Sequence, residues 1–198
     1  MTGPSAAGKT TWCRRHYPDE LVPEYAPTGD EPDDSDPAAQ ANFWSEVNCR
    51  RWSQATVVER DFGLAVCDDD PMKLHYCWSL LRVGLASPQR WEHEIAANLA
   101  AITAGRLGFA DLVLVSVPPA AELQRRRDED STRRRRNFEV HARLAEPLRQ
   151  WYQAMDLVEP GRVQWDLPPD GLPATVPTPR TNRCDPALLT ALLDALPR

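Results

Sequence analysis

The sequence predicts an α/β protein in which a parallel sheet is covered by helices on both faces, a three-layer α/β/α arrangement. Two observations lead to this prediction. Short apolar segments typical of buried strands alternate with segments of helical periodicity, and the chain opens with a Gly-x-x-x-x-Gly-Lys-Thr loop at residues 3–10. Such alternation favours parallel pairing, because each strand returns through a crossover helix. We interpret residues 1–198 as a single domain, since this length suits one α/β unit with a substantial core.

The loop at residues 3–10 leads into a predicted helix that ends before Pro18. In loops of this form, backbone N–H groups surround phosphate oxygens and the next helix directs its positive N-terminus at the same charge. The predicted nucleotide-binding residues are Gly3, Ser5, Ala6, Ala7, Gly8, Lys9, Thr10 and Thr11. Lys9 is the candidate catalytic cation among them, and the Thr10 hydroxyl is the natural ligand for Mg²⁺.

A phosphate-binding loop normally follows a buried strand, but only Met1 and Thr2 precede this one. Because a strand usually has about five residues, we expect the first strand to be absent or truncated. We favour a true start upstream of Met1. A chain that begins at Met1 would leave neighbouring strands without hydrogen-bond partners, or would need a partner to supply a strand.

The remaining elements follow in alternation. Strands are predicted at 20–25, 62–67, 112–117 and 162–165, and helices at 36–60, 72–83, 87–104, 137–155 and 185–196, with an arginine-rich helix after Pro119. Three of these helices open with a capping side chain and a proline, a pair typical of helix starts. The proline-rich residues 167–183 are predicted to be irregular.

Three carboxylates stand at the ends of predicted strands, where ligands bind in parallel α/β proteins. Glu24 could accept a proton from a substrate hydroxyl. Asp68 is a candidate for contact with Mg²⁺ or for orienting the acceptor, and Asp70 is a further catalytic candidate. The alternative interpretations are a solvated carboxylate for Glu24 and helix caps for the two aspartates, with Asp70 the better cap because it precedes Pro71.

The arginine-rich residues 125–137 allow three interpretations. They could bind polynucleotide phosphates, form a lid whose arginines close on a nucleotide, or make a solvated helix junction. Three interleaved acids and the absence of neighbouring aromatic residues weaken the first interpretation. We favour the lid, which would also exclude water, with Arg133 and Arg135 as its catalytic candidates.

Composition argues against three other classes of protein: nucleic-acid binders, membrane proteins and zinc proteins. A formal net charge of −6 argues against a general nucleic-acid binder. No apolar run approaches the roughly 20 residues that a membrane-spanning helix needs, so we expect no membrane partner and a cytoplasmic location. The five cysteines are scattered without metal-ligand spacing, which indicates reduced thiols instead of a zinc site.

Together these features resemble the P-loop nucleoside and nucleotide kinases, and within them the small kinases related to ribosylnicotinamide kinase. Four stretches show the resemblance: GPSAAGKTT, LVPEY, LAVCDDDPMKLHY, and ADLVLVSVPP followed by the arginine-rich segment. It implies a P-loop NTPase fold, ATP and Mg²⁺ as co-substrates, and a small hydroxyl-bearing acceptor. It also places Glu24, Asp68 and Asp70 among acceptor-site and magnesium-linked carboxylates, and Arg133 to Arg136 in the lid. The chain departs from its relatives at Asp69, where they often have Thr.

The predicted function is therefore ATP-dependent phosphoryl transfer to a hydroxyl of a small, nucleoside-like molecule. The expected partners are a nucleoside triphosphate and this acceptor, without nucleic acid. Two alternatives stay open: a regulatory P-loop ATPase that hydrolyses its nucleotide, and a binding module that senses nucleotide without chemistry.

Overall fold

The computed structural model describes residues 1–33, 35–129, 138–173 and 178–198, and in these the chain forms eight helices and four short strands. In chain order the elements are α1 (Lys9–His16), β1 (Leu21–Val22), α2 (Pro37–Phe62), β2 (Val66–Cys67), α3 (Leu74–Arg82), α4 (Pro88–Thr103), β3 (Val113–Val115), α5 (Ala120–Glu129), α6 (Phe138–Arg143), α7 (Ala145–Val158), β4 (Val163–Trp165) and α8 (Pro186–Ala195). The helix predicted over 137–155 is divided into α6 and α7. The carboxylates of Asp36 and Asp185 and the hydroxyl of Ser87 accept hydrogen bonds from first-turn N–H groups, which caps α2, α8 and α4 as predicted.

The predicted P-loop NTPase fold, a three-layer arrangement around a parallel sheet, is wrong. In the described residues no extended central sheet forms, and the strands make two separate parallel pairs, β1 with β2 and β3 with β4. The strands are short because breakers bound them. Pro23 directly follows β1, while Asp69 and Asp166, close behind β2 and β4, adopt positive φ angles of 70° and 67°.

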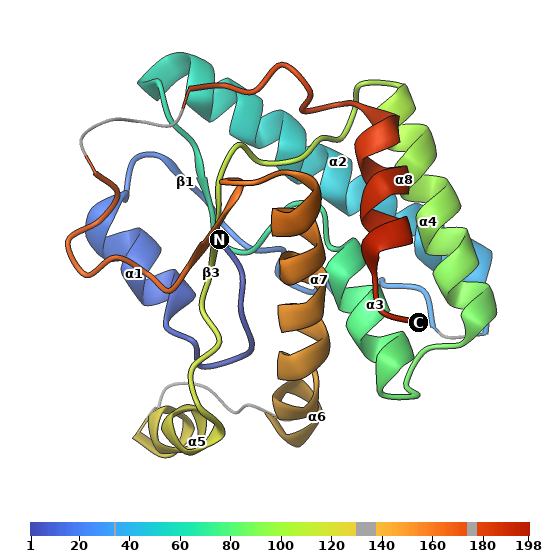
Figure 1. Cartoon of the computed structure of the whole chain (residues 1–198), viewed down its shortest axis with the longest axis horizontal. Coiled ribbons are helices and arrows are strands. Elements are labelled where there is room, and N and C mark those ends of the chain that lie inside the picture. The colour runs from blue at the N-terminus through green and yellow to red at the C-terminus, as the bar shows by residue number, and fades with distance from the viewer. Residues whose placement is uncertain (34, 130–137, 174–177) are drawn as a thin grey trace.

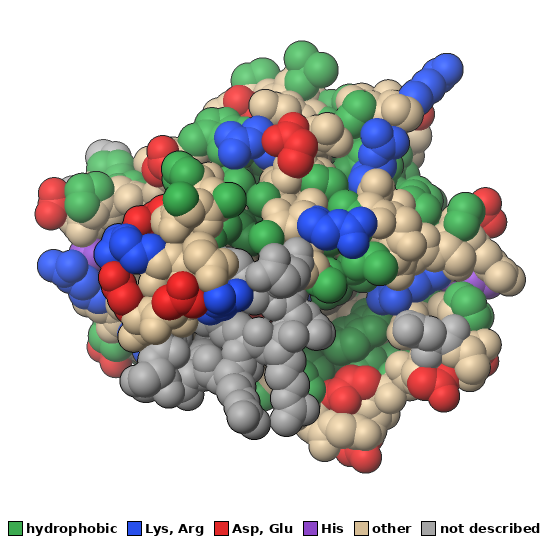
Figure 2. Space-filling model, turned by 90° about the horizontal axis from the view of Figure 1, so that it is seen from below, with side chains coloured by type: hydrophobic (Ala, Val, Ile, Leu, Met, Phe, Trp, Pro, Cys, Tyr) green, Lys and Arg blue, Asp and Glu red, His purple; other side chains and the backbone are tan. Residues whose placement is uncertain are grey.

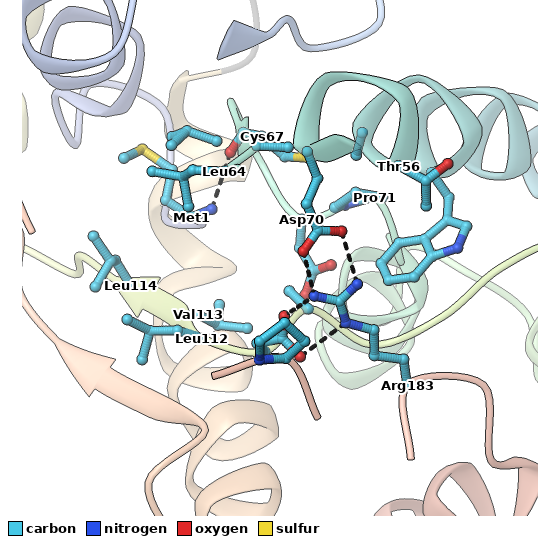
Figure 3. Close-up of a pocket in the computed structure, with 18 of the residues that line it drawn as sticks. Met1, Thr56, Leu64, Cys67, Asp70, Pro71, Leu112, Val113, Leu114 and Arg183 are labelled. Atoms are coloured by element: carbon cyan, nitrogen blue, oxygen red, sulfur yellow. Dashed lines mark hydrogen bonds and ion pairs between the residues drawn. The ribbon is translucent and has the colours of Figure 1, made fainter. Parts of the chain in front are cut away.

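Residues Met1 and Thr2 lie between the two pairs. Thr2 forms an isolated parallel bridge with Val115, and the Met1 amino group donates a hydrogen bond to the Cys67 carbonyl oxygen at 3.0 Å. Beyond Met1 the two pairs are separated by a mainly apolar cavity of about 150 Å³. In Figure 3, Met1, Leu64 and Cys67 lie on one side of this cavity and residues 112–114 on the other. Because this cavity, and not a strand, occupies the space between β2 and β3 in the described residues, the two pairs do not merge.

Two apolar clusters flank the strands. In Figure 1, α1 lies on one side of them, and α3, α4, α7 and α8 gather on the other. The larger cluster joins those four helices to β3 and β4, with Trp151 and Tyr152 among its most buried side chains, and the smaller one packs Trp12 and Cys13 of α1 beside Val66. No helix in the described ranges combines the length and the apolar character needed to cross a membrane.

The irregular C-terminal segment is fastened by ion pairs. The Arg183 guanidinium pairs with Asp111 and, at 2.6 Å, with Glu59 near the end of α2. The N–H of Phe109 donates to the Arg183 carbonyl oxygen at 2.8 Å. Residues 178–183 are therefore tied to both α2 and the segment before β3, which closes one end of the apolar cavity.

One buried carboxyl group lies within the helical layer. Glu94 of α4 is 5% exposed, and the nearest cation is Arg90, whose Nε lies 3.9 Å from its Oε1. Burial raises the pKa of Glu94 to about 7, and Arg90 offsets only part of this effect. The folded protein therefore favours the protonated acid over a pH range in which the unfolded chain is ionised.

We predict that Glu94 makes the stability of the protein fall with increasing pH. Because its folded pKa lies above the ordinary value of 4.5, the native state binds more protons between these two values, and up to about 3 kcal/mol of stability is lost as pH rises through them. Urea unfolding at pH 5 and pH 8 should show this loss in the wild type and a smaller loss in Glu94→Gln. Identical pH profiles for the two proteins would contradict the prediction.

Candidate functional site

The loop at residues 3–8 has a backbone shape that depends on its two glycines. A Cβ on Gly3 would collide with the Ser116 carbonyl oxygen, so the loop can pass this close to the end of β3 only without a side chain. Gly8 has φ 91°, a left-handed conformation that suits glycine, and it directly precedes α1. No side chain caps α1, and residues 8–11 line the cavity beside the loop, so the start of this helix could bind an anion there.

Lys9 spans the loop that precedes it. Its Nζ donates to the carbonyl oxygens of Gly3 at 2.7 Å and Pro4 at 3.3 Å. These two neutral acceptors hold the ammonium over the mouth of the loop. A phosphate in the loop would be a stronger, charge-assisted acceptor for the same group.

Thr10 and Asp68 come together as the sequence predicts for a magnesium site. The Thr10 hydroxyl donates to Asp68 Oδ2 at 2.7 Å, although the two residues are 58 positions apart. Asp68 is 4% exposed, and its Oδ1 has no hydrogen-bond partner in the described residues. A hydroxyl and a carboxylate with an unused buried oxygen are hard oxygen donors, which fit Mg²⁺.

A buried arginine of α2 fixes the ends of β1 and β2. Arg51 is 6% exposed. Its Nη2 donates to the carbonyl oxygens of Asp68 and Asp69 at 2.7 and 2.8 Å, and its Nε donates to that of Pro23 at 3.1 Å, while Nη1 reaches the Asp70 carbonyl oxygen at 3.4 Å. One guanidinium thus positions the backbone beside Glu24 and beneath three successive aspartates. Sequence analysis did not identify this role of Arg51. The available signal was an arginine midway along the helix predicted over 36–60.

Asp69, Lys73 and Glu24 form a second charged group near the loop. Lys73 Nζ lies 2.6 Å from Glu24 Oε1 and 2.9 Å from Asp69 Oδ2. Burial alone would raise the pKa of Asp69, but Lys73 and Lys9 outweigh it and hold that pKa well below its usual range. Burial likewise opposes the charge of Lys73, and the two carboxylates raise its pKa above the ordinary value. Asp69 and Lys73 are therefore both charged at neutral pH.

Asp70 is not brought to the phosphate-binding loop. Its Oδ1 accepts the N–H of Met72 at 3.0 Å, and its Oδ2 accepts the Tyr152 hydroxyl at 2.9 Å. His75 lies beside this pair with its Nδ1 3.3 Å from the Tyr152 hydroxyl, and burial lowers its pKa, which favours the neutral imidazole. Asp70 thus fixes the segment just before α3 and links it to α7. Its neighbour Asp69 instead lines the polar cavity beside the loop.

The predicted lid is described only in part. Arg133 and Arg135 lie outside the described residues, whereas α5 contains Arg126, whose Nη1 donates to the Ala7 carbonyl oxygen in the loop at 3.1 Å. Hydrogen bonds from Arg125 and Arg126 lower the pKa of Glu122 to about 2. Figure 2, which views the end of the molecule where α5 lies, shows acidic and basic side chains interspersed, without a continuous basic surface among the described residues.

A polar cavity of about 440 Å³ lies beside the loop. Residues 3–11 form one side, and Glu24, Asp69 and Lys73 line it together with His75 of α3. A cavity of this size can hold a small polar ligand next to a loop-bound phosphate. The structure therefore brings the loop, Glu24 and Lys9 together around one space, with Thr10 linking it to Asp68.

In comparisons with known proteins, no protein-family model and no curated protein matches this chain.

We predict that Arg51→Met lowers the free energy of unfolding by about 3 kcal/mol, because four backbone carbonyl oxygens would lose a buried, charged donor. Arg50→Met is the matched control. Arg50 precedes Arg51 on α2, but its side chain is 76% exposed and pairs only with Glu46 at 3.7 Å in the described residues, so its loss should cost less than about 0.5 kcal/mol. Urea unfolding of both variants measures the difference, and equal costs would contradict the role given to Arg51.

Proposed function

We propose that this protein is an ATP-dependent phosphotransferase that acts on a hydroxyl group of a small, nucleoside-like molecule. The observation that supports this most directly is the 2.7 Å hydrogen bond from Thr10 to Asp68, which joins the loop to the carboxylate predicted to act with it. A phosphate-binding loop, a candidate magnesium pair and a polar cavity for an acceptor then lie next to one another. The proposal rests on this local geometry and not on the sheet.

The loop side of the site would bind and orient the triphosphate. The N–H groups at the start of α1 and in the loop would bind phosphate oxygens, and Lys9 would exchange its carbonyl acceptors for them. Thr10 and Asp68 would hold Mg²⁺, which when bound neutralises charge on the phosphates. Arg126, already at the loop, would add positive charge over the same groups.

The opposite side would bind the acceptor. During transfer the acceptor oxygen forms a bond to the terminal phosphorus, the bond to the bridging oxygen breaks, and ADP leaves. The hydroxyl proton passes to a carboxylate, and Glu24 is our candidate because it lines the cavity and its side chain is 43% exposed, within reach of a bound molecule. Lys73 holds this carboxylate in place through the 2.6 Å ion pair.

We predict that Lys9→Ala abolishes acceptor-dependent ADP release. The assay supplies Mg²⁺-ATP with nucleosides, ribosylnicotinamide, sugars and aminoglycosides. The matched control is Arg15→Ala, which removes an exposed cation from the same helix outside the cavity and should retain wild-type turnover. ADP release that is the same with and without every acceptor would favour the hydrolysing alternative. Nucleotide binding without any turnover would favour the sensor.

We further predict that Thr10→Val weakens the binding of Mg²⁺-ATP by about tenfold while leaving Mg²⁺-free ATP binding nearly unchanged, because only the metal would lose a ligand. Isothermal titration with and without Mg²⁺ separates the two effects. Equal losses in both titrations would show that Thr10 supports the loop and not the metal.

A further inference from the structure

Asp69 lines the polar cavity, and one oxygen of its carboxylate is buried without a hydrogen-bond partner in the described residues. The Asp69 side chain is 9% exposed, and its Oδ1 has no hydrogen-bond partner in the described residues, whereas Oδ2 pairs with Lys73. Leaving a buried carboxylate oxygen unpaired costs free energy. The backbone of Asp69 adds to this cost, since φ is 70° in a residue other than glycine. Arg51 holds this conformation through the Asp69 carbonyl oxygen, so the fold keeps a carboxylate at the wall of the cavity despite these costs.

The charges of this side of the cavity do not cancel. Glu24 and Asp69 face the single cation Lys73, which both already engage at 2.6 and 2.9 Å. The neighbouring His75 is buried, and its lowered pKa adds no positive charge. The other cations that line the cavity, Lys9 and Arg14, belong to the loop and α1, where nucleotide phosphates would engage them. The acceptor side therefore keeps a net charge of about −1.

From these observations we propose that the acceptor is an uncharged or cationic molecule with several hydrogen-bond donors, such as a nucleoside, a polyol or an amino sugar, and that Asp69 is a specificity-determining residue through the negative charge that it places at the cavity. This inference rests on the proposed phosphotransferase function. An anionic acceptor, for example a nucleoside monophosphate or a sugar acid, would place its charge against Glu24 and Asp69 in a partly desolvated site. Such a contact is repulsive, whereas an ammonium group is attracted by the net negative charge and a hydroxyl group is not repelled by it.

The test compares matched acceptors that differ in charge. Cytidine is paired with cytidine 5′-monophosphate, and glucose and glucosamine are paired with glucuronate, each in the ADP-release assay with Mg²⁺-ATP. We expect kcat/KM for the uncharged or cationic member of at least one set to exceed that of its anionic member by about tenfold or more. Equal or faster turnover of the anionic members would overturn the inference while leaving the phosphotransferase function intact. ADP release indifferent to every acceptor would instead overturn the function on which the inference rests.

Charge variants test the residues themselves. Asp69→Asn changes this side of the cavity from about −1 to about 0 and keeps Glu24, the candidate base, so turnover can still be measured. The discrimination against anionic acceptors should fall by about fivefold. Asp194→Asn, which removes an exposed carboxylate from α8, should leave the discrimination unchanged. Stabilisation by Mg²⁺-ATP in a thermal unfolding assay shows whether Asp69→Asn is folded and keeps its loop. Discrimination that persists in this folded, nucleotide-binding variant would contradict the role given to Asp69.

Discussion

The geometry of the site depends on one buried cation, the guanidinium of Arg51. It donates to four carbonyl oxygens at the ends of β1 and β2, two strands of only two residues each. Strands this short cannot by themselves fix the segments that follow them. The guanidinium therefore does what a longer sheet would otherwise do: it sets the position of Glu24 and orients Asp68 and Asp69 towards the loop.

The two sides of the polar cavity have opposite electrostatic character, which suits two different ligands. The loop side presents helix N–H groups and the ammonium of Lys9, so it favours phosphate oxygens. The opposite side presents Asp69 and Glu24 bridged by Lys73 and favours hydrogen-bond donors. Thr10 and Asp68, paired at 2.7 Å, lie where the loop meets the end of β2. This division into an anion-binding and a donor-binding side is the physical basis of the proposed transfer between nucleotide and acceptor.

Sequence reasoning predicted the local elements well and their assembly poorly. The loop, the capped starts of α2, α4 and α8 and the positions of the four strands all follow from short-range rules of turn, cap and apolar pattern. In the described residues the two strand pairs do not join into one sheet, because an apolar cavity lies between β2 and β3, and local sequence pattern contains no information on how far apart two strands lie. On the side of β3 away from β4, Thr2 forms an isolated bridge with Val115. The three-layer prediction assumed one continuous sheet.

Within the candidate site, the sequence pointed to residues 68–70 but could not assign a position to each aspartate. Asp69 and Asp70 are adjacent, and their directions are set by the left-handed turn at Asp69 and by the Tyr152 hydroxyl, 82 positions from Asp70. Sequence analysis could not single out Arg126, because it lies in a run of arginines. Its contact with the Ala7 carbonyl oxygen distinguishes it from the neighbouring arginines that the structure describes. Lys73 offered a signal, because the sequence contains only one other lysine, but its pairing with Glu24 depends on the tertiary structure.

The most direct test of the account is ³¹P NMR of the protein incubated with Mg²⁺-ATP and a mixture of nucleosides, neutral polyols and amino sugars. The account predicts that the terminal phosphate resonance of ATP declines while a new phosphomonoester resonance grows in equal amount, because the phosphoryl group moves to an acceptor oxygen in the cavity. Growth of inorganic phosphate alone, or an unchanged ATP spectrum in the presence of bound nucleotide, would contradict it.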